Sequence, residues 1–404
     1  MAVEGNFRPA WAEIDLDALR ANAAVMAKRV APSALCAVVK ADGYGHGAVT
    51  AAVAFLEGGA EGLAVAIVDE GVELRQARII APILLLSEPP AEAMTAALAA
   101  GLTPTLTTLE GVRACADAAK QIGATHPVHI KVDTGMHRMG VEVEDLAELL
   151  SAIEAEDQLV IEGLWTHFSV ADEGSEESRA FTAAQLERFD EAVAIAAELG
   201  IHPPVLHVAN SAASLALPSA RRAMVRCGLA LYGDVPSEDV ASVASAEAPV
   251  ELRPAMAIKA AVSAIHDVPA AARPSYGRRR PMPAAGRVAT VPIGYADGFP
   301  RSLFDAGHEV LIGGQRFPLA GSVTMDQILV DVGDAPVAVG DEVVLLGTQG
   351  TETISVSEWA SHLDTISWEV FCGIGPRVPR REVGTPPAER VTVPMKRRWW
   401  RPRG

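Results

Sequence analysis

The sequence predicts an α/β protein in which a (β/α)8 barrel, resembling a TIM barrel, is followed by a mostly β C-terminal domain. Three observations lead to this fold class. From residue 11 to about residue 232, short apolar β-branched runs alternate with amphipathic, alanine-rich segments. Eight such strand–helix repeats are the number that closes a barrel of parallel strands. After about residue 245 the helical periodicity fades, and strands separated by Gly, Pro and Asp turns take over.

Each barrel strand is expected to be a short apolar run that precedes a helical segment. The runs lie at residues 36–41, 62–68, 82–87, 103–107, 127–133, 161–168, 205–209 and 223–228. The clearest helices are expected at residues 69–78, 110–122, 144–156 and 177–199. In the last of these, we expect an apolar stripe made of Phe181, Leu186, Phe189, Val193 and Ile195.

The second domain is predicted from turn-separated strands. They are expected at residues 256–266, 287–292, 309–312, 327–332 and 342–346, with one helix at 356–363. We therefore place the barrel at 1–245 and the β domain at 246–390, with a linker at 246–253. Residues 391–404 form a basic tail that ends in KRRWWRPRG. Such a tail can touch an anionic surface, but we favour a frayed terminus or one docked on the acidic body.

Composition excludes several classes of protein. The chain has 404 residues, half of them hydrophobic, which suits large globular cores. A formal net charge of −17 argues against nucleic acid as the main partner. Cys36, Cys115, Cys227 and Cys372 lie far apart without CxxC spacing, so neither a metal site nor a disulfide framework is predicted. The N-terminus lacks a signal-peptide pattern and no apolar window is long enough to span a membrane, so we expect a cytoplasmic protein without a membrane partner.

The most informative stretch is AVVKADGYGHGA at residues 37–48, which carries Lys40 at the end of an apolar run. A lysine in this place can be partly desolvated, which favours the neutral amine that condenses with an aldehyde. The glycines that follow let backbone N–H groups approach a ligand closely. Lys40 is therefore a candidate Schiff-base lysine, although a lysine that ends a strand is also commonly just a solvated residue.

Chemistry in such a barrel sits at the carboxyl ends of the strands. The polar side chains expected there are Lys40, Lys131, Asp133, Arg138, His167, Asn210, Ser211 and Arg226. Each has a structural alternative: a core position for His167, an ion pair with a carboxylate for Arg226, and a helix N-cap for Ser211. Their convergence on one rim favours a site for an anionic or carbonyl ligand.

The loops after the seventh and eighth strands of such barrels often hold a phosphate at a helix start. Asn210-Ser211 and Gly228-Leu229 occupy these two loops. A phosphate beside a Schiff-base lysine suggests pyridoxal 5′-phosphate as the cofactor, because this electron sink acidifies the α-carbon of a bound amino acid.

At this point the chain resembles the alanine racemases, which are pyridoxal-phosphate enzymes with a (β/α)8 barrel and a C-terminal β domain and which work as head-to-tail homodimers. The resemblance runs from RPAWAEID at residues 8–15 to RVPR at 377–380. Its motifs are VVKADGYGHG, KVDTGMHRMG, THFSVADE, HVANSAASL, MVRCGLALYG, PSYG, GYADGFPR and TMDQ. It implies an isomerase that interconverts L- and D-alanine, most commonly to supply D-alanine as a peptidoglycan precursor.

The resemblance also implies roles for the catalytic residues. Lys40 would hold the cofactor and act as the base on one face of the α-carbon in the external aldimine. Tyr276 of the partner subunit would be the base on the opposite face. Arg226 would face the pyridine nitrogen and keep it unprotonated, and His167 would link Arg226 to Tyr276.

Further roles follow from the same resemblance. Arg138 and the Met325 backbone N–H would bind the substrate carboxylate, and Lys131, often carbamylated in relatives, would steer Arg138. The remaining cofactor contacts would come from Tyr44, Asn210, Ser211, Gly228 and Leu229. Supporting positions in or near the entrance would be Asp172, Tyr295, Arg301 and Asp326.

The chain departs from the family pattern at three positions. Pro376 stands where many relatives have a tyrosine, so we expect a wider pocket and turnover of serine beside alanine. Ser322 stands where an arginine commonly lines the entrance, so we expect weaker attraction of carboxylates. Thr324 replaces a frequent cysteine or serine, with little expected effect.

Three other functions stay open. A broader racemase for small amino acids differs only in its pocket. A pyridoxal-phosphate decarboxylase shares the architecture, but its cysteine motif is missing here. A non-catalytic cofactor-binding barrel would not need the PSYG and TMDQ segments of the second domain.

Overall fold

The computed structural model describes residues 7–387, and these form two compact units that are described separately. The barrel unit comprises residues 18–43 and 48–253, and the β unit comprises 7–17, 44–47 and 254–386. The division differs from the expected one, because it falls after residue 253 rather than 245 and because the N-terminal strand belongs to the β unit. The basic tail expected at 391–404 lies outside the described residues.

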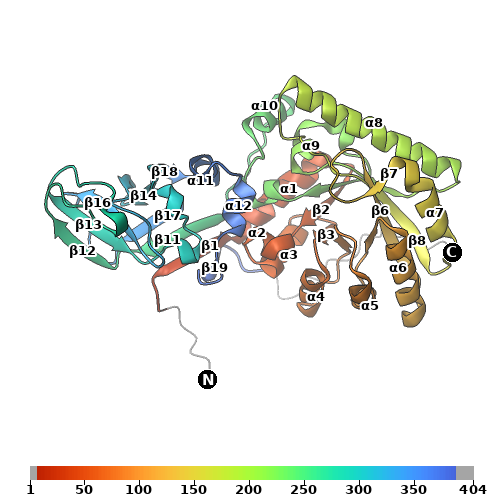
Figure 1. Cartoon of the computed structure of the whole chain (residues 1–404), viewed down its shortest axis with the longest axis horizontal. Helices are drawn as coiled ribbons and strands as arrows, with labels where there is room; N and C mark the ends of the chain where they lie inside the picture. The colour runs from red at the N-terminus through yellow and green to blue at the C-terminus, as the bar shows by residue number, and fades with distance from the viewer. Residues whose placement is uncertain (1–6, 388–404) are drawn as a thin grey trace. The chain divides into compact units, whose positions relative to one another are not determined.

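Eight parallel strands form the barrel unit's core, as predicted (Figure 1). Hydrogen bonds order them as β10-β2-β3-β4 and β5-β6-β8-β9. A bridge between Leu84 and Thr103 joins β4 to the segment before β5, and a bond from the Ala223 N–H to the Leu206 carbonyl (3.0 Å) joins β9 to β10. The strands are β2 (Ala34–Val38), β3 (Gly62–Val65), β4 (Ile83–Leu85), β5 (Thr105–Leu106), β6 (His126–Asp133), β8 (Leu159–Trp165), β9 (Val205–His207) and β10 (Met224–Cys227), with β7 (Val141–Glu142) paired to β6.

Helices follow the strands and cover the outside of the barrel. Thr108 caps the start of α6, where its side chain accepts from the Gly111 N–H, and Gly123 ends that helix in the left-handed conformation. The helices are α1 (Leu16–Val30), α3 (Ala48–Glu57), α4 (Val68–Gln76), α5 (Ala91–Ala99), α6 (Leu109–Ile122), α7 (Leu146–Glu154), α8 (Glu176–Glu198), α9 (Ser211–Ala216) and α10 (Glu238–Glu247).

The predicted apolar stripe of α8 is wrong. Of its five members only Phe189 is buried, and Phe181 is 40% exposed. The buried face instead carries small and polar side chains, including Gln185, which donates to the His167 carbonyl (3.2 Å) and accepts from the Ser169 N–H (2.9 Å). The buried face of α8 is thus held by hydrogen bonds from Gln185 and not only by apolar packing. A search for hydrophobic periodicity cannot detect a buried face of this kind.

Strand β2 ends at Val38, earlier than predicted, and Lys40 opens a left-handed turn, α2 (Lys40–Tyr44). Ala41 and Asp42 have φ of +53° and +51°, which costs about 1–2 kcal/mol for each residue with a side chain. Two carboxylates hold the turn: Glu70, from α4, accepts from the Ala41 N–H (2.7 Å), and Asp42, within the turn, accepts from the Ala48 N–H (2.9 Å). Lys40 therefore sits on a strained, fixed turn rather than on the strand itself.

Two sheets build the β unit. In the larger one the order is β15-β14-β17-β11-β1-β19, and β18 pairs with β17; the smaller one is β12-β13-β16. The strand predicted at 256–266 is in fact two strands, because the chain passes from one sheet to the other between Ala261 and Ala264. The strands are β1 (Ala10–Asp15), β11 (Met256–Ala261), β12 (Ala264–Val268), β13 (Gly286–Val291), β14 (Glu309–Ile312), β15 (Gln315–Pro318), β16 (Ile328–Gly333), β17 (Glu342–Gln349), β18 (Glu352–Ile354) and β19 (Arg380–Val383).

Helices α11 (Val356–Leu363), which matches its prediction, and α12 (Ser367–Cys372) complete the β unit. All four cysteines of the chain are thiols, as expected. Within residues 7–387, no helix combines the length and apolar character that crossing a membrane requires.

Residues 44–47, which follow the Lys40 turn directly, make their contacts inside the β unit. Arg380 donates to the Gly45 carbonyl (2.9 Å) and to the carbonyls of Ile374 (2.7 Å) and Gly375 (2.7 Å). Gly45 has φ of +73°, and a Cβ there would collide with the Phe371 carbonyl oxygen. The closing RVPR segment therefore fixes the segment that follows Lys40.

We predict that Gly45→Ala destabilises the protein more than Gly123→Ala does. Both glycines have φ of +73°, but an added Cβ at Gly123 meets nothing within 4 Å. Gly123→Ala should therefore cost only the left-handed penalty of about 1–2 kcal/mol. Gly45→Ala should cost roughly 2 kcal/mol more, because backbone must move. Urea unfolding of the two variants measures the difference, and equal midpoints would contradict the close-approach argument.

Candidate active site

Five residues predicted for the barrel rim act on one another in the barrel unit. The pKa of His167 is held well below its ordinary value by burial and by the charges of Arg226, Arg138, Lys131 and Lys40. Four basic side chains therefore act electrostatically on one neutral imidazole, and one of them, Arg226, contacts it. Such a concentration of positive charge suits the binding of an anion.

Asp133 is the carboxylate that follows Lys131 on β6, and it shapes the backbone rather than pairing with a cation. Its Oδ1 accepts from the N–H groups of Gly135 (2.8 Å), Met136 (2.9 Å) and His137 (3.1 Å). Those bonds lower the pKa of Asp133 in spite of its burial. The turn they form leads directly to Arg138, which is exposed.

The Arg226 guanidinium is buried and has acceptors on neighbouring strand ends. It donates to the carbonyls of Thr166 (2.8 Å), His207 (3.0 Å) and Val208 (3.2 Å), and its carbon lies 4.5 Å from the centre of the Trp165 ring. Burial lowers its pKa to about 10, so it stays charged at neutral pH. The alternative of a direct ion pair is wrong, because no carboxylate among residues 7–387 lies within ion-pair distance of it.

A chain of hydrogen bonds instead connects Arg226 to a distant carboxylate. Its NH1 donates to His207 Nδ1 (2.9 Å), and because the pKa of His207 lies well below its usual range, the proton of that neutral ring is on Nε2. His207 Nε2 then donates to His129 Nδ1 (2.8 Å), and His129 Nε2 donates to Glu162 (3.1 Å). Two imidazoles with assigned tautomers thus separate the guanidinium from its counter-charge.

The same guanidinium fixes His167. Arg226 NH2 lies 3.2 Å from His167 Nδ1, which must accept because a guanidinium only donates. The remaining ring nitrogen, Nε2, therefore carries the proton and is available as a donor. This is the tautomer that the expected link from His167 to a tyrosine hydroxyl requires.

Lys131 is 3% exposed and lies over the Trp165 ring, with Nζ 4.9 Å from its centre. Burial and then the charges of Arg138 and Arg226 lower its pKa to about 8. A lysine with this pKa has an appreciable neutral fraction at the upper end of the physiological pH range. It can therefore react as an amine.

The two loops predicted to hold a phosphate contact each other. Asn210 is the N-cap of α9, with its side chain accepting from the Ala213 N–H (3.0 Å), so the N-cap alternative for Ser211 is wrong. Ser211 Oγ accepts from the Gly228 N–H (2.9 Å), and Leu229 is buried directly after it. Short side chains and backbone N–H groups of the two loops lie together here, and Gly228 follows Arg226 by two residues in the chain. Such an arrangement suits an anionic group.

The β unit carries the other predicted residues, on loops between its strands. Tyr276 is 74% exposed, and the preceding Ser275, with φ of +67°, donates from Oγ to the Ser322 carbonyl (2.6 Å). A Cβ at Gly321 would meet the Pro274 carbonyl oxygen at 2.5 Å. The loop is thus fixed at its base while the phenol stands in solvent. Ser322 is buried at the base of this loop, and its expected effect on the attraction of carboxylates stays a prediction.

A line of ion pairs holds the TMDQ and RVPR segments together within the β unit. Asp326 pairs with Arg377 (2.6 Å), Arg377 with the buried Asp297 (3.3 Å), and Asp297 with Arg8 (2.8 Å). Exposed Met325 and Tyr295 lie on the same group of loops, because the Tyr295 N–H donates to the Thr324 carbonyl (3.0 Å). Pro376 and Arg301 are exposed, and Asp172, in the barrel unit, is half-buried.

Several residues of these sites were missed in the sequence. His207 lies in HVANSAASL, yet nothing in that run indicated a bond to Arg226. His129 and Glu162 stand inside apolar strands, where a single polar residue is a weak signal that becomes informative only once both side chains are seen to be buried. Glu70 and Arg380 act on backbone groups, and sequence does not show backbone partners.

Comparison with known proteins agrees with this arrangement. Residues 14–236 match the family "Alanine racemase, N-terminal domain" and residues 255–382 match "Alanine racemase, C-terminal domain". A curated alanine racemase of Symbiobacterium thermophilum is 43% identical over 92% of this chain and 97% of its own length. The crystal structure of the alanine racemase from D-cycloserine-producing Streptomyces lavendulae has a TM-score of 0.87 at 37% identity, covering 94% of this chain and 98% of that one. A histidine racemase from Leuconostoc mesenteroides has a TM-score of 0.84 at 29% identity, covering 94% and 99%.

A barrel unit with a cation-rich rim and a second unit of β-sheets, each matching its half of the same family, define an enzyme of the amino-acid racemase type. The chain belongs to the alanine racemase family.

We predict that Glu162→Ala destabilises the protein by about 1–3 kcal/mol, because it leaves the His129 N–H buried without an acceptor. Glu162→Gln should recover most of this loss, since an amide oxygen also accepts. Urea unfolding measures the stability, and ¹⁵N NMR should show His207 protonated on Nε2 in the wild type. Glu156→Ala, which removes a surface partner of Lys120, is the control and should change little. A Glu162→Ala variant as stable as the wild type would contradict the chain of bonds.

Proposed function

We propose that this enzyme interconverts L- and D-alanine with pyridoxal 5′-phosphate and two bases, Lys40 and Tyr276. The observation that carries the proposal is the pair of arginines, Arg138 and Arg226, whose charges act together with that of Lys40 on a neutral His167 that Arg226 contacts directly. An amino-acid carboxylate and a phosphorylated cofactor together supply the anionic charge that this set of cations requires. The names of curated relatives that are 40–43% identical support alanine over a broader alanine and serine range.

The residues present fit the proposed cofactor. Lys40 supplies the amine, and Tyr44, His167, Asn210, Ser211, Gly228 and Leu229 are the other groups proposed to hold it. Bound through its aldehyde to a substrate amine, pyridoxal phosphate withdraws electrons and acidifies the α-hydrogen. Arg226 would face the ring nitrogen as a donor and leave it without a proton, since its pKa of about 10 keeps the guanidinium charged. The histidines bonded to Arg226 are neutral acceptors and do not offset that charge.

Inversion at carbon requires a proton to leave from one face and to return on the other, so two groups must stand on opposite faces. Lys40 Nζ would take or return the proton on one face and Tyr276 Oη on the other. Arg138, with the Met325 N–H, would hold the substrate carboxylate and fix which faces are presented. His167, as an Nε2 donor, would orient the tyrosine hydroxyl.

We further propose a homodimer in which Tyr276 reaches the partner's barrel. The exposure of Tyr276 on a loop with a fixed base supports this proposal, because a catalytic phenol standing in solvent needs a second surface. Asp172, Tyr295, Arg301 and Asp326 would then line the approach to the shared site. A cytoplasmic location and a role in supplying D-alanine accompany this proposal.

Heterodimers of two inactive variants test the shared site. Lys40→Ala and Tyr276→Phe homodimers should each lose about 10²-fold or more of alanine racemisation. Co-expression with two affinity tags isolates the heterodimer, in which one site has both bases and the other has neither. We expect it to recover about half of the wild-type activity per dimer, as the symmetry of a shared site requires.

Alanine and serine should be assayed side by side in that experiment. An inactive heterodimer would refute the exchange of Tyr276 between subunits, while both homodimers remaining active would refute the two-base assignment. Serine turnover equal to that of alanine would favour the broader racemase and assign the effect to Pro376. Release of carbon dioxide without inversion would indicate the decarboxylase.

We also propose that Lys131 is carbamylated, which would convert a cation beside Arg138 into an anion that pairs with it. Its pKa of about 8 supports this, because carbon dioxide adds to the neutral amine. We predict a carbamate ¹³C NMR signal in protein equilibrated with ¹³C-bicarbonate, absent in Lys131→Ala. Lys259→Ala is the control, since Lys259 is an ammonium paired with Glu13 (3.0 Å) and Glu342 (3.3 Å). An unmodified Lys131 amine that titrates near pH 8 would refute this proposal.

A further inference from the structure

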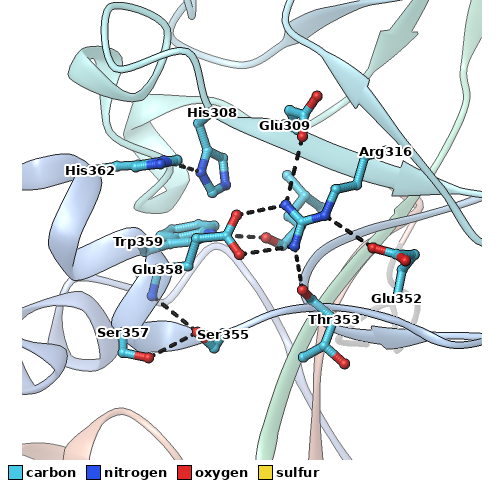
Figure 2. A network of polar contacts seen from close by, with 11 residues as sticks. His308, Glu309, Arg316, Glu352, Thr353, Ser355, Ser357, Glu358, Trp359 and His362 are labelled. Atoms are coloured by element: carbon cyan, nitrogen blue, oxygen red, sulfur yellow. Dashed lines mark hydrogen bonds and ion pairs between the residues drawn. The ribbon is translucent and has the colours of Figure 1, made fainter. Parts of the chain in front are cut away.

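Two histidines and a glutamate gather in the β unit, among the loops and helix that flank β14 (Figure 2). His308 directly precedes β14, and Glu358 and His362 are four residues apart on one face of α11. One ligand atom from each lies within 4.8 Å of those of the other two. The cysteine spacing predicts no metal site, and His308 is about fifty residues from the other two ligands in the sequence, so no local motif indicates this one.

His308 is fully buried and only half satisfied. Its Nδ1 lies 2.9 Å from His362 Nδ1, and its Nε2 has no hydrogen-bond partner among the described residues. Phe299 and Trp359 pack around the ring, with ring centres 6.1 and 5.6 Å away. Figure 2 shows the His308 ring next to that of His362. The two Nδ1 atoms that face each other share one proton, and a metal ion that replaces this proton can be bound by both nitrogens.

The surroundings of the cluster are negatively charged. Arg316 binds both carboxylate oxygens of Glu358 (2.8 and 3.0 Å) and also pairs with Glu352 (3.2 Å) and Glu309 (3.7 Å), which leaves this group with a net charge of −2 (Figure 2). Arg316 orients the Glu358 carboxylate as an outer-sphere partner orients a metal ligand, while each oxygen keeps a further lone pair. Glu358 and His362 are half-buried, so water can supply another ligand.

We propose that His308, Glu358 and His362 bind one divalent transition-metal ion, with Zn²⁺ as the best match. Two imidazoles, one carboxylate and a water are a common tetrahedral set for zinc. Tetrahedral zinc with bonds of about 2.0–2.1 Å places two nitrogens about 3.3 Å apart, so the histidine pair needs to open by only about 0.4 Å. The carboxylate oxygen, now within 4.8 Å of both ring nitrogens, must move inward by up to about 1.5 Å, which its half-buried position allows.

The ion would join the start of β14 to α11. Helix α11 packs on α12, and α12 carries the Phe371 carbonyl that meets Gly45. Metal binding would therefore stabilise the part of the β unit on which residues 44–47 rest. The site is built from residues other than those proposed for racemisation, so its effect is on stability rather than on the chemical step.

The experiment uses the full-length protein stripped of metal by dialysis against a chelator. Titration with ZnCl₂ by calorimetry should give one ion per chain, and His362→Gln should lower the affinity at least tenfold. Glutamine keeps the helix and a hydrogen bond to His308, so racemase activity without metal should be unchanged and shows that the variant is folded. Zn²⁺ should raise the thermal unfolding midpoint of the wild type and not that of His362→Gln.

His266→Gln is the matched control, because His266 is an exposed histidine of the same unit outside the cluster. It should bind Zn²⁺ as the wild type does, and Co²⁺ should give tetrahedral visible bands in both. Mg²⁺ should not compete, because it prefers oxygen ligands. The proposal is overturned if the wild type and His362→Gln bind Zn²⁺ equally, if His266→Gln loses as much affinity, or if Mg²⁺ displaces the zinc.

Discussion

A positive charge fixed inside the barrel determines much of the rest of the site. Arg226 collects carbonyl oxygens from the residues that follow β8 and β9, and so holds the ends of three neighbouring strands in one geometry. Removing a guanidinium from water is costly. Here the cost is offset by oriented carbonyls, by the Trp165 ring and by the carboxylate of Glu162, which is connected through two histidines, rather than by a direct ion pair. The direction of every hydrogen bond from Arg226 to Glu162 then follows from the fact that a guanidinium can only donate.

The same charge has consequences for its neighbours. Added to burial, which is the larger effect, it holds the pKa values of His167 and His207 low, and together with Arg138 it lowers that of Lys131. The charges of Arg226 and Arg138 act on the same neighbours before any ligand binds, which stores unfavourable electrostatic energy in the folded protein. An anionic ligand releases that energy, so part of the affinity for such a ligand arises from repulsion already present in the protein.

The elements that depend on the hydrophobic pattern could be predicted from the sequence. All eight barrel strands and α11 were predicted, since apolar runs report burial directly. Lys40 and Arg226 were singled out because strand ends meet on one rim. The rest depends on polar contacts that a hydrophobic pattern does not show: the left-handed Lys40 turn needs Glu70 and Asp42, and the polar inner face of α8 needs the bonds between Gln185 and the segment after β8. The PSYG segment has no local property that distinguishes a catalytic tyrosine from an ordinary exposed one. The role predicted for Tyr276 therefore rests only on the family resemblance.

The path of the chain between the two units limits how the protein can be dissected. The described chain passes from one unit to the other after residues 17, 43, 47 and 253, so neither unit is one continuous segment. A fragment that ends at residue 253 would keep β1 without its partners β11 and β19, and the complementary fragment would lack both β1 and the segment that Arg380 holds. Separate expression of the barrel unit would therefore require rejoining chain segments that the β unit interrupts, rather than simple truncation.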